Sequence, residues 1–266
     1  MNKSVTNIDT AIPTPQRYGS TLLIARRGTQ NSILLVALHR PKVKNAFSDD
    51  QYLDLISILK QVQEDDSISA LVLTGMGDYF SSGADLSAFQ FDDEDDDDDF
   101  DGNYEEESKS TRDKKKGTID KPAGRFMMTM LSFPKVLCCA VNGPAVGIGV
   151  TLLPHCDLVY CTNQSTFWVP FTRIALVPEF ASSITFVEAM GMGCANELLL
   201  LGEKIDAEKA VSYRLCNGII HGCNHRCKDA FASDSIASMV CQDLDRKLLS
   251  LPCGEKTSRV STLEKL

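Results

Sequence analysis

A single carboxylate stands in an otherwise uncharged stretch of the sequence, Glu179 within the segment ALVPEFASS. A carboxyl group among small and apolar residues loses hydration, so we expect its pKa to rise toward the range that suits a general base. The sequence leaves open an alternative, in which Glu179 stabilises the dipole of the helix that follows it. Glu179 is nevertheless the candidate catalytic residue.

Two glycine-containing segments could hold negative charge on a substrate oxygen. The first is FSSGADL at residues 80–86, and the second is AVNGPAVGIGVTLL at residues 140–153. Each follows an apolar run that predicts a buried strand, and glycine lets the backbone approach a ligand closely. The N–H groups of the loop and of the first helical turn can then stabilise an oxyanion. Two such segments in one chain predict an oxyanion hole.

The charged residues near these segments allow two interpretations each. Asp85 follows the glycine of the first segment and could contact a ligand, but an aspartate at the start of a helix commonly caps it. Arg40, Lys42 and Lys44 form a basic cluster within HRPKVKNAF. Such a cluster could meet phosphate groups, or it could be a solvated face of the protein.

Two patterns resemble parts of metal sites, but neither has the full spacing. The histidines and cysteines of HGCNHRC (residues 221–227) alternate, whereas zinc ligands are usually spaced as C-x2-4-C pairs. Residues 97–102 match the first half of a calcium-binding loop, but Ser108 stands where a bidentate glutamate is needed. We therefore predict no metal site. The chain also has no G-x-S-x-G elbow and no P-loop.

The composition describes a soluble globular protein with one unusual segment. The 266 residues are 43% hydrophobic, and the net charge of −9 arises mainly at residues 92–121, which hold 14 acidic and 6 basic residues. The remainder is close to neutral, which argues against nucleic-acid binding. No stretch reaches the roughly 20 apolar residues of a membrane span. The ten cysteines are expected to be reduced and mostly buried.

The periodicity predicts alternating strands and helices around one continuous core. Apolar runs predict a hairpin over 21–38 and strands at 69–74, 136–141, 158–161 and 166–169. Ser48 and Gln51 form the pattern of a capping box before a helix. Further helices are expected at 125–131, from 147, and at 182–190, 194–201 and 207–215. The repeated order of strand, strand and helix predicts the α/β class.

We divide the chain into three parts. Residues 1–19 are expected to be a flexible arm, residues 20–220 the folded core, and residues 221–266 a C-terminal helical segment. Within the core, residues 91–121 are expected to be a disordered acidic insertion, because their composition cannot bury enough apolar surface to offset ordering.

Three segments together resemble the crotonase (enoyl-CoA hydratase/isomerase) superfamily. These are RPKVKNAF, ALVLTGMGDYFSSGADLSAF and KVLCCAVNGPAVGIGVTLLPHCDLVY. The resemblance implies a spiral of ββα units that binds acyl-CoA, with the thioester oxygen held by the N–H groups of Ala84 and Ile148. It also implies that the substrate and its CoA group lie against Lys42, Ala46, Ser82, Gly83, Ala84, Asp85, Leu86, Gly147 and Ile148. No cofactor beyond the coenzyme A of the substrate is implied.

The acids indicate which members of the family the chain is similar to. Hydratases of the family carry one glutamate where Thr151 stands and another where Phe171 follows Pro170. The segment TFWVPFTRIALVPEFASS instead resembles peroxisomal-type Δ3,Δ2-enoyl-CoA isomerases, in which a single glutamate at the position of Glu179 acts. The resemblance therefore implies the movement of a double bond from C3 to C2 in the β-oxidation of unsaturated fatty acids.

Other functions remain open at this point. The alternatives are another crotonase-type reaction, such as hydration, thioester hydrolysis or dehalogenation, and a non-catalytic module that binds acyl-CoA or protein. The family also implies a homotrimer or hexamer. The final residues, Glu-Lys-Leu, resemble a peroxisomal Ser-Lys-Leu address, so we expect a peroxisomal enzyme, with the mitochondrion or cytosol as alternatives.

Overall fold

A seven-stranded sheet lies at the centre of the computed structural model, which describes residues 14–85, 120–222 and 228–249. Its strands lie in the spatial order β1 (Gln16–Tyr18), β2 (Leu22–Arg27), β3 (Ile33–Leu38), β4 (Ala70–Gly75), β5 (Val136–Val141), β7 (Leu158–Cys161) and β10 (Gly218–Ile219). The first three strands pair antiparallel, and all pairs from β3 to β10 are parallel. The α/β class predicted from the sequence is confirmed.

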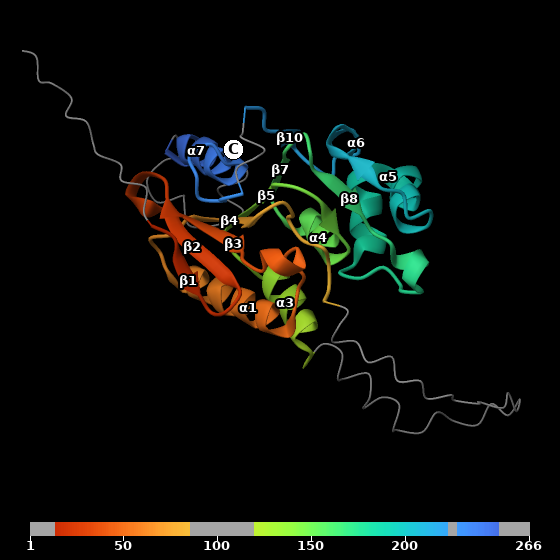
Figure 1. Cartoon of the computed structure of the whole chain (residues 1–266), viewed down its shortest axis with the longest axis horizontal. Coiled ribbons are helices and arrows are strands. Elements are labelled where there is room, and N and C mark those ends of the chain that lie inside the picture. The colour runs from red at the N-terminus through yellow and green to blue at the C-terminus, as the bar shows by residue number, and fades with distance from the viewer. Residues whose placement is uncertain (1–13, 86–119, 223–227, 250–266) are drawn as a thin grey trace, which may run out of the picture.

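Helices cover both faces of this sheet (Figure 1). One face packs against α1 (Asp49–Glu64) and α3 (Pro122–Leu131), and the other packs against α7 (Ile236–Leu249). Strand β3 is buried at every position, with Leu34 in one apolar cluster and Leu35 in the other, because successive side chains point to opposite faces. The prediction of one continuous core is therefore wrong. The parallel strands separate two cores.

A smaller sheet and the remaining helices lie beside the large sheet (Figure 1). This region contains β6 (Ala145–Val146), β8 (Thr166–Trp168), β9 (Ile205–Asp206), α4 (Ile148–Thr151), α5 (Ser182–Leu199) and α6 (Ala207–Ser212). Short 3-10 turns are η1 (Thr29–Asn31), η2 (Pro41–Val43), η4 (Leu153–His155) and η5 (Phe171–Ile174). The two helices predicted at 182–190 and 194–201 are confirmed as the two parts of α5, which are separated by a kink at Gly191 with a non-helical φ of 80°.

Several local predictions are confirmed, and two need correction. The hairpin of β2 and β3 forms, and Ser48 caps α1 by accepting a hydrogen bond from the Gln51 N–H. The Gln51 side chain makes no return bond within the described residues, so only half of the capping box is present. The predicted arm over 1–19 includes β1, which pairs with β2. The strand was not predicted because its residues are mostly polar. A 2.8 Å hydrogen bond between the Tyr18 and Ser57 hydroxyls anchors it to α1.

Some predictions fall on residues that the structure leaves undescribed. These include most of the acidic insertion, the calcium-like pattern, most of the HGCNHRC segment and the C-terminal tripeptide. Of the described cysteines, every one is a free thiol, and most are buried, as predicted. Among the described helices, none combines the length and apolar character needed to cross a membrane.

Candidate active site

The first predicted oxyanion segment is pinned by backbone hydrogen bonds. After β4, the Phe47 N–H donates to Gly83 O (2.8 Å), and the Asp85 N–H donates to Phe47 O (2.8 Å). In a trans peptide the carbonyl and the next N–H point in opposite directions. Because Gly83 O points at Phe47, the N–H of Ala84 points away from Phe47. That N–H donates to no acceptor within the described chain.

The second segment presents an N–H group by the same geometry. Gly147 O accepts hydrogen bonds from the Val150 and Thr151 N–H groups, at 2.8 and 3.0 Å, as α4 begins. The Ile148 N–H, on the same peptide as Gly147 O, therefore points backwards out of the helix. It belongs to the first turn of a helix, where N–H groups have no intrahelical partner. Within the described residues it donates to no acceptor, although Ile148 is buried.

The two segments lie against each other. Ser81 pairs with Ala145 as a parallel bridge, and the Val146 N–H donates to Ser81 O at 2.9 Å. A Cβ atom on Gly83 would lie 3.1 Å from Val146 O and 3.7 Å from the Cα of Gly147. Both glycines have positive φ, 94° and 53°, which an L side chain would strain. Glycine is thus required where the segments meet, and their two N–H donors belong to adjoining loops.

The predicted catalytic acid occupies a strained turn rather than a helix end. Glu179 is half-buried, and loss of hydration raises the pKa of its carboxyl to about 7. Helix α5 begins at Ser182, and no acidic residue lies in its first turn, so the alternative of a helix-stabilising acid is not supported. Phe180 and Ala181 have φ values of 52° and 53°. Such strain in non-glycine residues is typical of functional sites.

His155 supports this turn. Its Nε2 lies 2.8 Å from Phe180 O, and its ring stacks on the Phe180 ring with 4.0 Å between centroids. This role could not be predicted, because His155 is a lone histidine in LLPHCD with no motif around it. The turn that carries Glu179 is therefore held from η4, the short helix that follows α4.

A row of aromatic side chains connects Glu179 to the first oxyanion segment. Phe180 packs on Phe126 of α3, which packs on Phe47 and on Tyr52 of α1. Burial raises the pKa of the Tyr52 phenol, and the negative charge of Glu179 raises it further. Tyr52 therefore lies within electrostatic range of Glu179, while its ring stacks on Phe47, the residue paired with Ala84. Tyr52 is buried in α1, and no motif in the sequence around it indicates a site.

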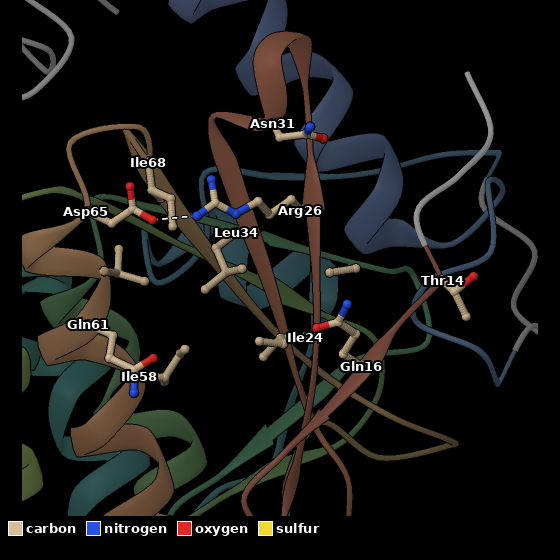
Figure 2. Close-up of a pocket in the computed structure, with 12 residues that line it drawn as sticks. Thr14, Gln16, Ile24, Arg26, Asn31, Leu34, Ile58, Gln61, Asp65 and Ile68 are labelled. Atoms are coloured by element: carbon tan, nitrogen blue, oxygen red, sulfur yellow. Dashed lines mark hydrogen bonds and ion pairs between the residues drawn. The ribbon is translucent and has the colours of Figure 1, made fainter. Parts of the chain in front are cut away.

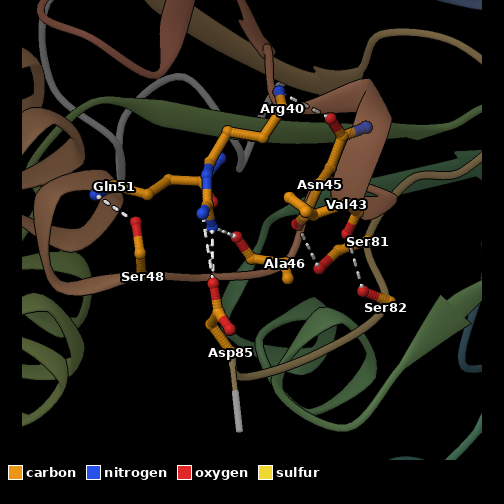
Figure 3. A network of polar contacts seen from close by, with 9 residues as sticks. All are labelled: Arg40, Val43, Asn45, Ala46, Ser48, Gln51, Ser81, Ser82 and Asp85. Atoms are coloured by element: carbon orange, nitrogen blue, oxygen red, sulfur yellow. Dashed lines mark hydrogen bonds and ion pairs between the residues drawn. The ribbon is translucent and has the colours of Figure 1, made fainter. Parts of the chain in front are cut away.

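The three residues of the basic cluster, Arg40, Lys42 and Lys44, have different surroundings in the structure. Arg40 forms an ion pair with Asp85, with both Nη atoms 3.1 Å from Oδ2 (Figure 3). Lys42 and Lys44 are exposed, and the Lys44 ammonium lies 5.0 Å from the centroid of the Tyr79 ring. Arg40 is thus engaged within the protein, whereas the two lysines present charge to solvent.

The other predicted binding residues lie in the same loops. Ala46 is buried, and its carbonyl accepts a hydrogen bond from Arg40 at 2.5 Å. Ser82 donates from its N–H to Lys44 O (2.9 Å) and from its hydroxyl to Val43 O (3.3 Å). Leu86 lies outside the described residues, as does any helix that Asp85 could cap.

The two positions at which the resemblance implies hydratase acids hold no carboxylate. Thr151 is fully buried in α4, and its hydroxyl has no hydrogen-bond partner in the described chain. Phe171 is buried at the start of η5. Among the described residues, no group of three or more histidine, cysteine or acidic side chains could hold a metal ion.

A cavity of about 350 Å³ lies elsewhere, between the hairpin of β1–β3 and α1 (Figure 2). Its polar lining includes the ion pair of Arg26 with Asp65, and its apolar lining includes Ile24 and Leu34. None of the candidate site residues lines it, so it is separate from the region of Glu179.

The strand and helix order, with two glycine loops that meet after β4 and before α4, defines an α/β protein of the crotonase-like class. The chain belongs to the enoyl-CoA hydratase/isomerase family, whose model matches residues 28–124 and 99–222. The structure of OdaA from Pseudomonas aeruginosa is similar, with a TM-score of 0.70 and 29% identity over 92% of this chain and 82% of that one. The predicted family and fold are thereby confirmed.

Named relatives include two isomerases. The chain is 40% identical over 182 residues to "Enoyl-CoA delta isomerase 2" of Rattus norvegicus, covering 68% of this chain and 42% of that protein. It is 36% identical to "Enoyl-CoA delta isomerase 3, peroxisomal" of Mus musculus, covering 68% of this chain and 52% of that protein. The matched region thus spans about half the length of these relatives.

Proposed function

We propose that this chain is an enoyl-CoA isomerase that moves a double bond from C3 to C2 of an acyl-CoA thioester during the oxidation of unsaturated fatty acids. The observation that carries the proposal is a half-buried carboxyl, Glu179, with a pKa of about 7 and no acid at the positions of Thr151 and Phe171. A base near neutral pH suits proton transfer, and the absence of the two other acids disfavours hydration. The relatives named enoyl-CoA delta isomerase support the same choice.

The proposed reaction needs one acid and no added water. The Glu179 carboxylate removes a proton from C2, and the electron pair of that C–H bond forms a C1=C2 bond as the C1=O electrons move onto the thioester oxygen. In the resulting dienolate, negative charge is shared between the thioester oxygen and the carbon chain. Protonated Glu179 then returns the proton to C4, which regenerates the carboxylate and gives the 2-enoyl thioester. When C4 is protonated, the carbonyl re-forms, the C1=C2 pair becomes the C2=C3 bond, and the C3=C4 pair takes up the proton.

The dienolate oxygen is proposed to accept hydrogen bonds from the N–H groups of Ala84 and Ile148. Their orientation away from the protein's own acceptors supports this role. Donors fixed in advance at a developing charge stabilise the transition state more than the ground state, and loss of one such donor typically costs about 10²–10³-fold in rate. Gly83 and Gly147 let the substrate approach both donors.

The rest of the ligand is proposed to lie along the loops that carry Ala46, Ser82 and Asp85. Lys42 and Lys44, both exposed, are proposed to attract the phosphates of coenzyme A. Coenzyme A is part of the substrate, so the proposal needs no further cofactor.

Glu179→Gln tests the proposal. Glutamine keeps the shape of the side chain but removes the base, so conversion of 3-enoyl-CoA to 2-enoyl-CoA should fall by about 10²–10⁴-fold. Binding of acyl-CoA, measured by calorimetry, should stay close to that of the unchanged protein. Glu188→Gln, at an exposed glutamate of α5, is the matched control and should keep full activity.

Product analysis separates the other reactions. Formation of 3-hydroxyacyl-CoA from 2-enoyl-CoA would indicate a hydratase, and release of free coenzyme A would indicate a hydrolase. Acyl-CoA binding without any conversion would indicate a binding module. Near-normal isomerisation by Glu179→Gln would remove Glu179 from the mechanism.

Assembly and location are further parts of the proposal. Ile174, Val177 and Ile184 are apolar and exposed on η5, the turn and α5, and Val177 is 80% exposed. Exposed apolar side chains on neighbouring stretches of the sequence favour association, so we propose a homotrimer or hexamer, to be checked by light scattering after size-exclusion chromatography. The peroxisomal relative supports a peroxisomal location, which imaging of the tagged full chain checks.

A further inference from the structure

We propose that Arg40 is a positioning residue that fixes the N–H of Ala84 for the substrate oxygen. The inference rests on the proposed function, because it concerns one donor of the proposed oxyanion hole. Arg40 contacts Ala46 and Asp85, the neighbours of Phe47 and Ala84, from a loop that contributes neither the acid nor the oxyanion N–H groups (Figure 3).

The side chain of Arg40 connects the two strands of a small parallel pairing. On one side its Nη1 donates to Ala46 O at 2.5 Å, immediately before Phe47. On the other side Nη1 and Nη2 both lie 3.1 Å from Oδ2 of Asp85, immediately after Ala84. Between these contacts, Phe47 and Ala84 form the isolated backbone bridge. Arg40 therefore holds together the residues that flank this bridge.

The bridge itself is short, which gives the side-chain contact its importance. Within the described residues two backbone bonds form it, from the Phe47 N–H to Gly83 O and from the Asp85 N–H to Phe47 O, and the Ser82 N–H to Lys44 O bond lies just before it. The direction of the Ala84 N–H depends on the first of them, since it shares a peptide plane with Gly83 O. Gly83 has a φ of 94°, a conformation that glycine leaves readily for others. A clamp on the following residue limits that freedom.

The simultaneous contacts of Arg40 with Ala46 O and Asp85 depend on the guanidinium group of arginine. The guanidinium is planar and carries several donors, so one side chain can bond a carbonyl and a carboxylate together, whereas lysine offers a compact point charge. The Arg40 and Asp85 side chains are only 25% and 20% exposed, so water and salt screen their attraction less than at the surface. The backbone of Arg40 is fixed as well, since its N–H donates to Asn45 Oδ1 at 2.9 Å.

The consequence is a specific kinetic signature. A displaced Ala84 N–H weakens the hydrogen bond that grows strongest in the transition state, so kcat should fall more than the affinity for substrate. Removal of a complete oxyanion donor typically lowers the rate by about 10²–10³-fold. Because the Arg40 variants only displace the donor, we expect kcat to fall by about 10–100-fold. A contribution to binding of the coenzyme A phosphates would instead raise KM and leave kcat unchanged.

The experiment uses the full chain with two substitutions, Arg40→Gln and Arg40→Lys, and two readouts. The first is kcat and KM for 3-enoyl-CoA. The second is the infrared carbonyl stretch of a bound 2-enoyl-CoA labelled with ¹³C at the thioester carbon, which moves to lower frequency when the oxygen is hydrogen-bonded. This shift reports the position of the donors without turnover. Arg40→Lys provides a milder variant should Arg40→Gln fail to fold.

Arg26→Gln is the matched control. Arg26 also forms an ion pair with an aspartate, Asp65, with side chains 40% and 34% exposed, but it lies by the separate cavity of Figure 2. This substitution removes a comparable interaction far from the site. It should leave both kcat and the carbonyl shift unchanged.

The inference is supported if both Arg40 variants lose part of the carbonyl shift and of kcat while KM stays within about 3-fold. It is overturned, with the proposed function intact, if the variants keep the shift and kcat of the unchanged protein, or if only KM changes. If the unchanged protein shows neither isomerisation nor a carbonyl shift, the proposed oxyanion hole is wrong and the role of Arg40 falls with it.

Discussion

Gly83 and Gly147 face each other where the two loops meet, with 3.7 Å between a Cβ built on one and the Cα of the other. This contact brings together residues from β4's loop and from the start of α4, which are more than sixty positions apart in the sequence. Because each glycine precedes one of the two outward-facing N–H groups, their separation sets the width of the proposed oxyanion hole. Several predictions depend on that spacing and on the turn that carries Glu179.

Gly83→Ala should impair catalysis. The new Cβ would lie 3.1 Å from Val146 O, and a φ of 94° is unfavourable for alanine, so the loop must shift. We expect kcat to fall by about 10-fold or more and stability to fall by about 1–2 kcal/mol. Steady-state kinetics and thermal unfolding measure both. Gly193→Ala in α5 is the control, since its Cβ would meet no atom within 4 Å. That change should leave kcat intact and should not destabilise the fold.

The activity should depend on pH through Glu179. The carboxylate is the proposed base and its pKa is about 7, so kcat/KM should fall as the pH decreases through 7. A pH profile with its acidic limb near 7 agrees with this assignment. A limb near 4.5, the ordinary value for glutamate, would contradict the desolvation of Glu179.

The raised pKa of Glu179 also makes the stability of the folded protein depend on pH. Between pH 4.5 and about 7 the folded state keeps a proton on Glu179 that the unfolded state has lost, so stability decreases as the pH rises. Glu179→Gln removes this ionisation. The variant should therefore be more stable than the unchanged protein above pH 7, by about 1–3 kcal/mol, and equally stable below pH 4.5. Urea unfolding across this range tests the prediction, and a constant difference would refute it.

His155→Phe should separate the stacking of His155 from its hydrogen bond. Phenylalanine retains a ring against Phe180 but loses the nitrogen 2.8 Å from Phe180 O. The strained turn at Phe180 and Ala181 should then relax, so we expect kcat to fall by about 10-fold with a stability loss of about 1 kcal/mol. Kinetics and thermal unfolding are the measurements. Unchanged kcat in a folded variant would show that the turn does not need this bond.

Lys42 and Lys44 should act on substrate binding alone. Replacing both with glutamate should raise KM for acyl-CoA in low salt, since the coenzyme A phosphates would then meet negative charge. The corresponding pantetheine thioester lacks the nucleotide phosphates, so its KM should not change. Lys60→Glu, at an exposed lysine of α1, is the control. Equal effects on both thioesters would argue against a phosphate contact.

The sequence predicted those features that depend on local pattern. The apolar runs of β3, β4 and β5 and the glycine loops were visible because burial and positive φ restrict residue types directly. The family resemblance added the N–H groups of Ala84 and Ile148. The separation of two cores was missed although the pattern carries it: a continuous apolar run such as ILLVAL at residues 33–38 indicates a strand covered on both faces, since a strand covered on one face alternates apolar and polar residues. The surroundings of Glu179 could not be predicted, since only tertiary packing brings His155 to Phe180 and Tyr52 within electrostatic range of Glu179.

The ion pair of Arg40 could not be predicted from the sequence either. Its place in a basic run indicates a solvated face or a phosphate contact, and only the fold brings it to Asp85, 45 positions away. A salt bridge between distant loops leaves no spacing signal in a single sequence. The short strand β1 was missed for a related reason, because an edge strand of three residues carries little apolar pattern.

Phe47 contacts described residues on both sides of the segment 86–119 in the sequence. Its backbone bonds Asp85, the last described residue before the segment, and its ring packs on Phe126 of the helix that begins shortly after it. One buried residue therefore joins the last described residue before the segment to the first described helix after it. Because the same residue serves both contacts, a change at Phe47 disturbs both sides of the segment together.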